Sequence, residues 1–404
     1  MSAVINAPQP DSTFEPFSQE FRGDPTAWHA ELLRTSPAFI APENYPSAVV
    51  ATYAQTQAVL RDSARFSSVK PKNLPGMERV DFFNGMPVMN YSDPPDHTRL
   101  RRVVAPAFTP RRIQETSEAT AGFIEDLLAP IGSDQTMDAV NQVCKPLSIR
   151  LLLGHFLGVE PQDQPIFLHY ISTLYLLDKL RPGEPKPKAF LDAWAAGEAY
   201  CRKALEDTKR KGTQNLIGLI GAAQDGGTMS DAEMMAMLVV LFSGGISTVA
   251  GAASSSLYHL ATNPDIAERI RKDPALASRH LEESLRMDPP VTLVMRFATE
   301  DVEIGGKVIR QGMPVYTMIS VACRDPAEFP DPGHFDIDRV NTRHLSFGFG
   351  IHVCIGNTIT RTVVPMLVRA VANRYPNLRV DPAASVSWET SPRSRHMKTV
   401  PLLT

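Results

Sequence analysis

The stretch FGFGIHVCIG, residues 347–356, decides the fold of this chain. Gly348 and Gly350 permit a tight turn and a close approach of the backbone to a flat partner, because glycine has no side chain. Cys354 lies just ahead of a predicted helix, Ile359 to Tyr375, and amide groups at a helix start stabilise a thiolate. A free cysteine is more often a small buried hydrophobe, but the glycines around this one favour a ligand role.

The composition is that of an ordinary globular protein. The 404 residues are 43% hydrophobic, 7% aromatic and 21% charged, which argues against disorder and against a fibrous role. A formal net charge of -3 gives no general attraction for nucleic acid. The four cysteines have no CxxC spacing, so the sequence supports neither a disulfide framework nor a zinc knuckle.

The first residues and the absence of linkers indicate one domain. The chain starts without a basic segment followed by an apolar one, so no secretory signal is expected. The longest apolar run, Met234 to Phe242, is about half a membrane span, and no long Gly/Ser linker divides the chain. We therefore predict a cytoplasmic protein without membrane contact, with a flexible extension over residues 1–11 and a single domain over residues 12–404.

Helical periodicity dominates the sequence. Apolar residues recur at helical spacing in Pro25 to Thr35, Tyr53 to Leu60, Pro95 to Ala105, Arg111 to Leu128, Val140 to Leu157, Pro187 to Arg210 and Asn215 to Gln224. The clearest helix is predicted to start at Ser230, which has capping-box spacing to Glu233, and to run to Pro264. Such a helix would be roughly 50 Å long, and Gly244-Gly245 lies in its middle.

Strand signals are few. Short strands are predicted at Ala48 to Ala51 and at Val315 to Ser320, and a tight hairpin is predicted across Gly305-Gly306. The run RDPAEFPDPGHFDIDR, residues 324–339, is too rich in Pro, Asp and Gly for a regular element. Pro365 lies inside the last predicted helix, where a proline is expected to kink or interrupt the helix.

The cysteine stretch resembles the haem-binding signature of the cytochrome P-450 family, FGxGxHxCxG. All its fixed positions are present, at Phe347, Gly348, Gly350, His352, Cys354 and Gly356. The resemblance implies a mainly α fold with small β-sheets, in which a helical body with a long central oxygen-binding helix adjoins a minor antiparallel β region. It also implies haem b, with Cys354 as the axial ligand of the iron and Phe347, Gly348 and Gly356 against the cofactor. A haem of this kind inserts oxygen into unactivated bonds, so a monooxygenase is expected.

Glu283 and Arg286 form an ExxR pair on one predicted helix face. On an exposed helix such a pair contributes little to stability. The family resemblance adds Arg339 as the third member of a buried triad, with the structural role of holding the cysteine loop. Loss of one member would leave an unpaired interior charge.

The run DPPDHTRLRR, residues 93–102, resembles the helix of the family that faces the haem propionates. His97 and Arg101 are four residues apart, on one face, and both can donate hydrogen bonds to a carboxylate. By the same resemblance Arg296 and His352 complete the propionate-binding set.

The glycine pair Gly244 and Gly245 precedes Ser247 and Thr248. The family places an acid and then a threonine here, where a local distortion of the helix makes room for dioxygen. Thr248 matches the threonine and Ser247 replaces the acid. A frame one residue earlier would put Ile246 at the acid position, and neither frame supplies a carboxylate. Because serine is not an ionised acceptor near neutral pH, we expect Thr248 and ordered water to carry the protons.

Apolar residues at the pocket positions of the family predict a small apolar substrate, hydroxylated or O-dealkylated with O2. They are Phe82, Phe83, Met86, Met89, Val240, Val291, Leu293 and Val294. No flavin or ferredoxin domain is attached, so electrons from NAD(P)H would come through a separate ferredoxin reductase and ferredoxin. The ferredoxin would dock on a basic face formed by Arg101, Arg102, Arg111, Arg112 and Arg361.

Two other functions stay open at this point. The missing acid also suits a peroxide-using or non-oxygenative haem-thiolate enzyme. A non-catalytic haem sensor or ligand carrier would have the same cysteine loop, although Thr248 and the apolar pocket speak against it.

Overall fold

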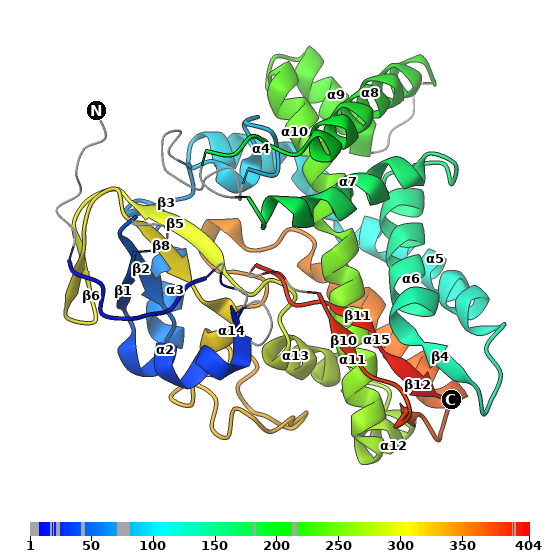
Figure 1. Cartoon of the computed structure of the whole chain (residues 1–404). Helices are drawn as coiled ribbons and strands as arrows, with labels where there is room; N and C mark the ends of the chain where they lie inside the picture. Colours follow the sequence, from blue (N-terminus) through cyan, green and yellow to red (C-terminus); the bar gives the residue numbers. More distant parts are fainter. Residues whose placement is uncertain are drawn as a thin grey trace.

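The computed structural model describes residues 8–16, 18, 20–21, 25–41, 45–70, 81–180, 183–211, 216–389, 391 and 393–404. Figure 1 shows a body of helices beside a smaller part that contains most of the strands (blue and yellow). The predicted mainly helical fold with small sheets is confirmed. Of the predicted extension, residues 1–7 lie outside the described residues, and Asp11 accepts a hydrogen bond from the Phe39 amide at 2.7 Å. The boundary at residue 12 stays a prediction.

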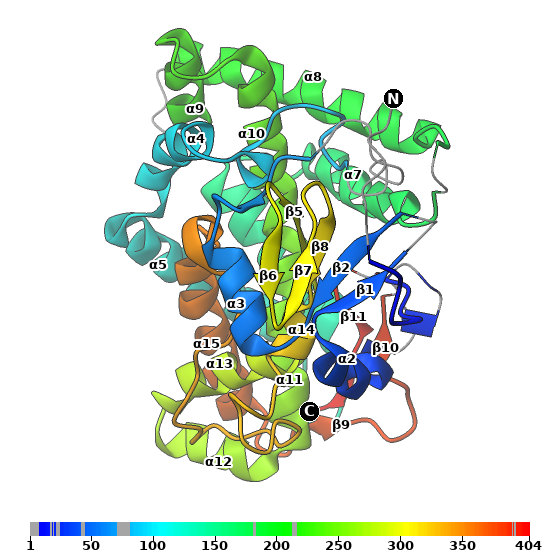
Figure 2. The same cartoon turned by 90° about the vertical axis from the view of Figure 1, so that its left-hand side faces the viewer.

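The helical part has a long element at its centre with the other helices around it (Figures 1 and 2). The helices of the first half are α2 (His29–Thr35), α3 (Tyr53–Arg61), α4 (Asp96–Val104), α5 (Pro110–Leu128), α6 (Lys145–Ile149), α7 (Gln164–Leu177) and α8 (Lys188–Lys211). Those of the second half are α9 (Leu216–Asp225), α10 (Asp231–Gly244), α11 (Ile246–Thr262), α12 (Pro264–Lys272), α13 (Leu276–Met287), α14 (Ile319–Ala322) and α15 (Asn357–Arg374).

The largest sheet has the strand order β1-β2-β8-β5-β3. Its strands are β1 (Ala38–Ile40), β2 (Ser47–Val50), β8 (Pro314–Thr317), β5 (Val294–Ala298) and β3 (Phe66–Ser67). Among the strands that the structure describes, only β2 and β8 pair in parallel. In the antiparallel pair of β5 and β8, Arg296 lies opposite Val315. The sheet thereby fixes the backbone of one predicted cofactor residue.

Three smaller sheets complete the strand content described. The predicted hairpin across Gly305-Gly306 is confirmed as β6 (Val302–Ile304) and β7 (Lys307–Ile309). The other two are the pair β10 (Ser387–Trp388) and β11 (Met397–Thr399), and the sheet β4-β12-β9 made of Thr136–Asp138, Pro401–Leu403 and Arg379–Val380.

The core centres on α11. Every residue from Val249 to Leu257 is buried, and most of them are Ala, Ser or Gly, so neighbouring helices approach closely. The span Asp231–Thr262 is long and apolar enough to cross a membrane by length and composition, and 67% of its most apolar window is buried inside the protein. Burial of this extent is typical of the core helix of a globular protein.

The prediction of one uninterrupted helix from Ser230 to Pro264 is wrong at one point. The capping box of Ser230 and Glu233 is present, but α10 ends at Gly244 and α11 begins at Ile246. A Cβ atom on Gly245 would lie 2.7 Å from Cδ1 of Leu152. A larger residue at position 245 would require the end of the Leu152 side chain to move, and glycine avoids this contact.

Three further expectations need correction. The predicted strand Val315 to Ser320 ends at Thr317, since α14 follows. Pro365 does not interrupt α15, because a helix buried along one face tolerates the loss of one hydrogen bond. The predicted helix Val140 to Leu157 is regular only over α6, with π-helical turns on both sides. The periodicity also missed α7 and α12.

Candidate active site

The cysteine loop is a tight turn before α15. Gly348 and Gly350 both have a φ of +71°, which favours glycine, and the Cys354 amide donates to the Phe347 carbonyl at 2.8 Å. A Cβ atom on Gly350 would lie 2.7 Å from the Leu60 carbonyl oxygen. Gly350 is therefore required twice, by its backbone conformation and by its contact with α3.

Cys354 differs from the other three cysteines, which are buried, because its side chain is exposed. The protein atoms that surround the thiol raise its pKa, whereas the amides of Gly356 and Asn357 and the guanidinium groups of Arg101 and Arg361 lower it. These four groups stabilise the thiolate, the form of cysteine that binds a metal.

Four donor side chains gather beside the cysteine loop. His97 and Arg101 come from α4, Arg296 comes from β5, and His352 precedes Cys354 by two residues. The rings of His97 and His352 lie 4.2 Å apart, and Arg101 Nη2 donates to the Val353 carbonyl at 2.8 Å. The four residues predicted to bind propionates are thus brought together, and we call them the cationic cradle.

The cationic cradle is electrostatically unfavourable without an anion. Burial, with the charges of the neighbouring cations, lowers the pKa of His352 to about 3, and burial lowers the pKa of Arg296 to about 10. His97 Nε2 is buried without a hydrogen-bond partner among the described residues. Such a cluster fits the two carboxylates of a haem, which would supply acceptors and negative charge.

The predicted triad is buried and fully bonded. The side chains of Glu283 and Arg286 are each 1% exposed, and Arg339 Nε lies 3.3 Å from both carboxylate oxygens of Glu283. The two arginines donate to the carbonyls of Cys323, Pro330, Asp331, Pro332 and His334. These bonds hold Cys323 and the meander at residues 324–339, and the Leu345 amide in turn donates to Cys323 Sγ at 3.3 Å. The predicted role of holding the cysteine loop stays a prediction.

The cysteine loop is tied to α13 by a residue that the sequence did not single out. Ser346 Oγ donates to the Leu285 carbonyl at 2.6 Å. Ser68 was missed in the same way, and its Oγ lies 2.9 Å from His352 Nε2. Neither serine is part of a recognisable pattern, so only the tertiary contacts reveal them.

The helix break lies directly before the residues expected to handle dioxygen. Thr248 Oγ1 donates to the carbonyls of Gly244 and Gly245 at 3.0 and 3.2 Å, and Ser148 Oγ donates to the Ile246 carbonyl at 2.8 Å. These side-chain bonds satisfy backbone oxygens around the break. Ser247 and Thr248 are both half-buried.

The predicted pocket residues fall into different clusters. Phe83, Met89 and Val240 are buried in the main core, with Phe82 and Met86 packed against it. Leu293 belongs instead to a core beneath the amino-terminal segment, with Phe14 and Tyr316. Val294 packs on a third cluster, and Val291 pairs with Ser394 of the carboxyl-terminal segment. The structure therefore does not bring all eight together.

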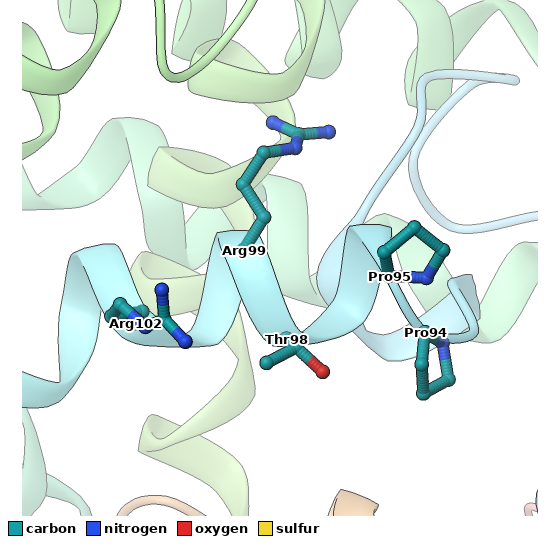
Figure 3. Close-up of a pocket in the computed structure, with 5 residues that line it drawn as sticks. All are labelled: Pro94, Pro95, Thr98, Arg99 and Arg102. Carbon is teal, nitrogen blue, oxygen red and sulfur yellow. The ribbon is translucent and has the colours of Figure 1, made fainter.

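A surface pocket of about 630 Å³ lies against the outer side of α4 (Figure 3). It is lined by Pro94, Pro95, Thr98, Arg99 and Arg102, none of which is a predicted substrate residue.

Of the predicted basic face, Arg102 is exposed here. Arg101 is half-buried, and its guanidinium donates to the Val353 carbonyl of the cysteine loop. Arg111 and Arg112 share Glu115, and Arg361 pairs with Glu282.

The fold and this site are those of a haem-thiolate oxygenase, and comparisons with known proteins agree. The family model "Cytochrome P450" matches residues 39–375. The 6-deoxyerythronolide B hydroxylase of Saccharopolyspora erythraea is 32% identical over 396 residues, covering 93% of this chain and 94% of its own. The monooxygenase PikC of Streptomyces venezuelae is 30% identical over 394 residues, 95% of this chain and 92% of its own. The crystal structure of CalO2 matches with a TM-score of 0.84 and 29% identity, over 96% of this chain and 98% of that one.

The chain therefore belongs to the cytochrome P450 family. It is a P450 monooxygenase, and its cofactor is haem. The acidic residue expected before Thr248 is absent all the same, since Ser247 stands there.

Proposed function

We propose that Cys354 is the axial ligand of the haem iron, and that the cationic cradle of His97, Arg101, Arg296 and His352 binds the propionates. The observation that carries this proposal is the exposed Cys354 thiol beside buried donor groups, the Arg296 guanidinium and the unpartnered Nε2 atom of His97. Bound haem with a thiolate ligand supplies the activation of dioxygen that inserts one oxygen atom into the substrate.

Other residues of the chain would then stabilise the thiolate, contact the cofactor and deliver protons. The amides of Gly356 and Asn357 and the charges of Arg101 and Arg361 keep Cys354 in its thiolate form. Gly348 and Gly350 let the loop backbone approach the flat cofactor, with Phe347 and Gly356 beside it. Thr248 and ordered water would pass protons toward dioxygen, and the break at Gly244 and Gly245 would leave space for it.

The substrate of this proposal is a small apolar molecule that is hydroxylated or O-dealkylated. The buried apolar residues Phe83, Met89 and Val240 support it, and one relative is named as a hydroxylase. Two electrons per turnover would come from NAD(P)H through a separate ferredoxin reductase and ferredoxin in the cytoplasm.

The reduced carbon monoxide spectrum tests the ligand. Wild-type protein should show the red-shifted band of a thiolate-bound haem, Cys354→Ser should lose it, and Cys201→Ala, which changes a buried cysteine, should keep it. A Cys354→Ser variant that keeps the band would overturn the assignment.

The electron source is tested separately. Compounds that displace the iron-bound water are first found by a shift of the Soret band, and the best one is incubated with NADH, ferredoxin and reductase, or with hydrogen peroxide alone. Product in the first incubation supports the proposal. Product only with peroxide would favour the peroxide-using alternative. Ser247 at the acid position is consistent with that alternative.

A further inference from the structure

A histidine near the carboxyl terminus presses against the helix that carries Ser247 and Thr248. His396 lies directly before β11 and is 7% exposed. Its Nδ1 atom lies 2.5 Å from the position that a Cβ atom would take on Gly251 of α11. Any residue larger than glycine at position 251 would therefore displace the imidazole ring.

The contact contains two features that are unfavourable for stability. His396 Nδ1 is buried without a hydrogen-bond partner in the part of the chain that the structure describes, and such a group costs about 1–3 kcal/mol. Gly251 lies inside a helix, where glycine is about 1 kcal/mol less favourable than alanine. An apolar side chain facing an alanine would avoid both costs. This combination indicates that the imidazole has a role beyond packing.

Helix geometry places this contact beside the two hydroxyl residues. Gly251 follows Ser247 by four residues and Thr248 by three, and all three lie within α11. Side chains at these spacings are neighbours on one helix face, with Cβ atoms about 5–6 Å apart. The imidazole that covers Gly251 is therefore within the reach of a hydrogen bond through one water to the Ser247 hydroxyl.

The surroundings keep the imidazole neutral. Burial, and next the charge of Lys145 at the start of α6, lower the pKa of His396 to about 4. The neighbouring Arg395 is turned away, with its guanidinium 4.0 Å from the Trp388 ring and its Nε 3.6 Å from Asp288 Oδ1. A neutral imidazole has one nitrogen that donates and one that accepts, which is what a proton relay requires.

We propose that His396 is a positioning residue for proton delivery, hydrogen-bonded through one water to Ser247, so that the serine and the histidine together replace the missing carboxylate. When the Ser247 hydroxyl passes on a proton, one nitrogen of the His396 ring donates a replacement proton to Ser247. The other ring nitrogen takes up a proton from solvent water. The ring and the serine return to their starting forms, and the protons consumed in oxygen reduction come from solvent. This inference rests on the proposed function.

The test compares His396→Phe, Ser247→Ala and Thr248→Ala in the haem-loaded enzyme, with Met397→Leu as a neighbouring control. We expect the first two variants to lower product per NADH by about tenfold or more, with matching release of hydrogen peroxide, as loss of acid–base assistance does. The double variant should be no worse than either single one, because both residues serve one relay. The solvent deuterium isotope effect on turnover should change in the same variants and not in Met397→Leu.

Gly251→Ala provides a second approach that leaves every polar group in place. It should lower the midpoint of thermal unfolding in the wild-type background and not with His396→Gly, because only the imidazole collides with the new methyl group. It should also uncouple turnover. Gly251→Ala therefore tests the role of His396 even if His396→Phe does not fold.

The outcomes separate this inference from the proposed function. Normal coupling in folded His396→Phe or Gly251→Ala, with uncoupling in Thr248→Ala, would refute the role of His396 alone. Normal coupling in Thr248→Ala as well would refute the proton route of the proposed function. A Cys354→Ser protein that keeps its thiolate band would refute the haem site itself.

Discussion

The Nε and Nη2 atoms of Arg286 each lie 2.8 Å from a different carboxylate oxygen of Glu283. The paired side chains are each 1% exposed, so the pair has almost no access to solvent. A bidentate pair of this kind is geometrically specific, and its arginine continues to the carbonyls of the meander. A change to either residue should therefore disturb a region that extends well beyond the pair.

Glu283→Gln should destabilise the protein by about 3–5 kcal/mol, because Arg286 and Arg339 would keep their buried charges without a carboxylate. The measurements are denaturant unfolding and haem content per chain. Glu268→Gln, which breaks an exposed pair with Lys272, is the control and should change neither. Equal stability of the two variants would contradict the structural role of the triad.

Gly350→Ala should reduce haem occupancy. A left-handed backbone costs a non-glycine residue about 1–2 kcal/mol, and the new methyl group would also meet the Leu60 carbonyl at 2.7 Å. Gly306→Ala is matched, since Gly306 has a φ of +78° but no atom within 4 Å of the added Cβ. The control should keep its Soret absorbance per chain. If both variants bind haem equally, the contact with α3 does not determine the loop.

Stability should fall as the pH drops from about 6.5 to about 4. Burial lowers the pKa of His280 to about 4, below its ordinary value of about 6.5, so the unfolded chain takes up a proton that the folded one refuses. The contribution of this group to stability is thus complete above pH 6.5 and is lost on acidification, by about 3 kcal/mol. His396 acts in the same direction.

His280→Gln should flatten this pH dependence. Its Nε2 lies 2.8 Å from the Ser256 carbonyl, and glutamine can still donate there without titrating. The free energy of unfolding is measured by denaturant titration at several pH values, beside His169→Gln on the exposed side of α7. An unchanged slope in His280→Gln would show that other groups govern acid unfolding.

Arg102→Glu should slow reduction by ferredoxin about three- to tenfold at low salt, because rim charges act mainly on the rate of association. Arg102 is exposed on the face of α4 where the pocket lies (Figure 3). High salt should remove most of the difference. Lys272→Glu, on α12 at the opposite end of the molecule (Figures 1 and 2), should reduce normally. If stopped-flow measurements find the same reduction rate for both variants, the ferredoxin docks on another face.

Motifs whose chemistry depends on local spacing were predictable. The turn of Gly348 and Gly350 ahead of Cys354, the pair Glu283 and Arg286, and the hairpin across Gly305-Gly306 each involve residues within a few positions of one another. For such sets the backbone geometry alone places the side chains together. The capping box at Ser230 is predictable for the same reason.

Other features depended on contacts between distant segments. The sequence placed Arg101 both in the propionate-binding set and in the docking face, and only the structure shows that its guanidinium donates to the Val353 carbonyl. Leu293 was expected in the pocket and packs beneath the amino-terminal segment instead. Side-chain direction is set by the neighbours that fill the remaining space, and no local pattern encodes these neighbours.

By itself, then, the sequence determined a mainly helical P450 chain with Cys354 in its haem-binding loop, because a short and specific pattern carries that information. Only the tertiary structure decided that the long helix breaks at Gly245 against Leu152, and that His396 meets Gly251 beside Ser247. Residues 251 and 396 are far apart in the chain, and the close packing of a protein interior brings them into contact.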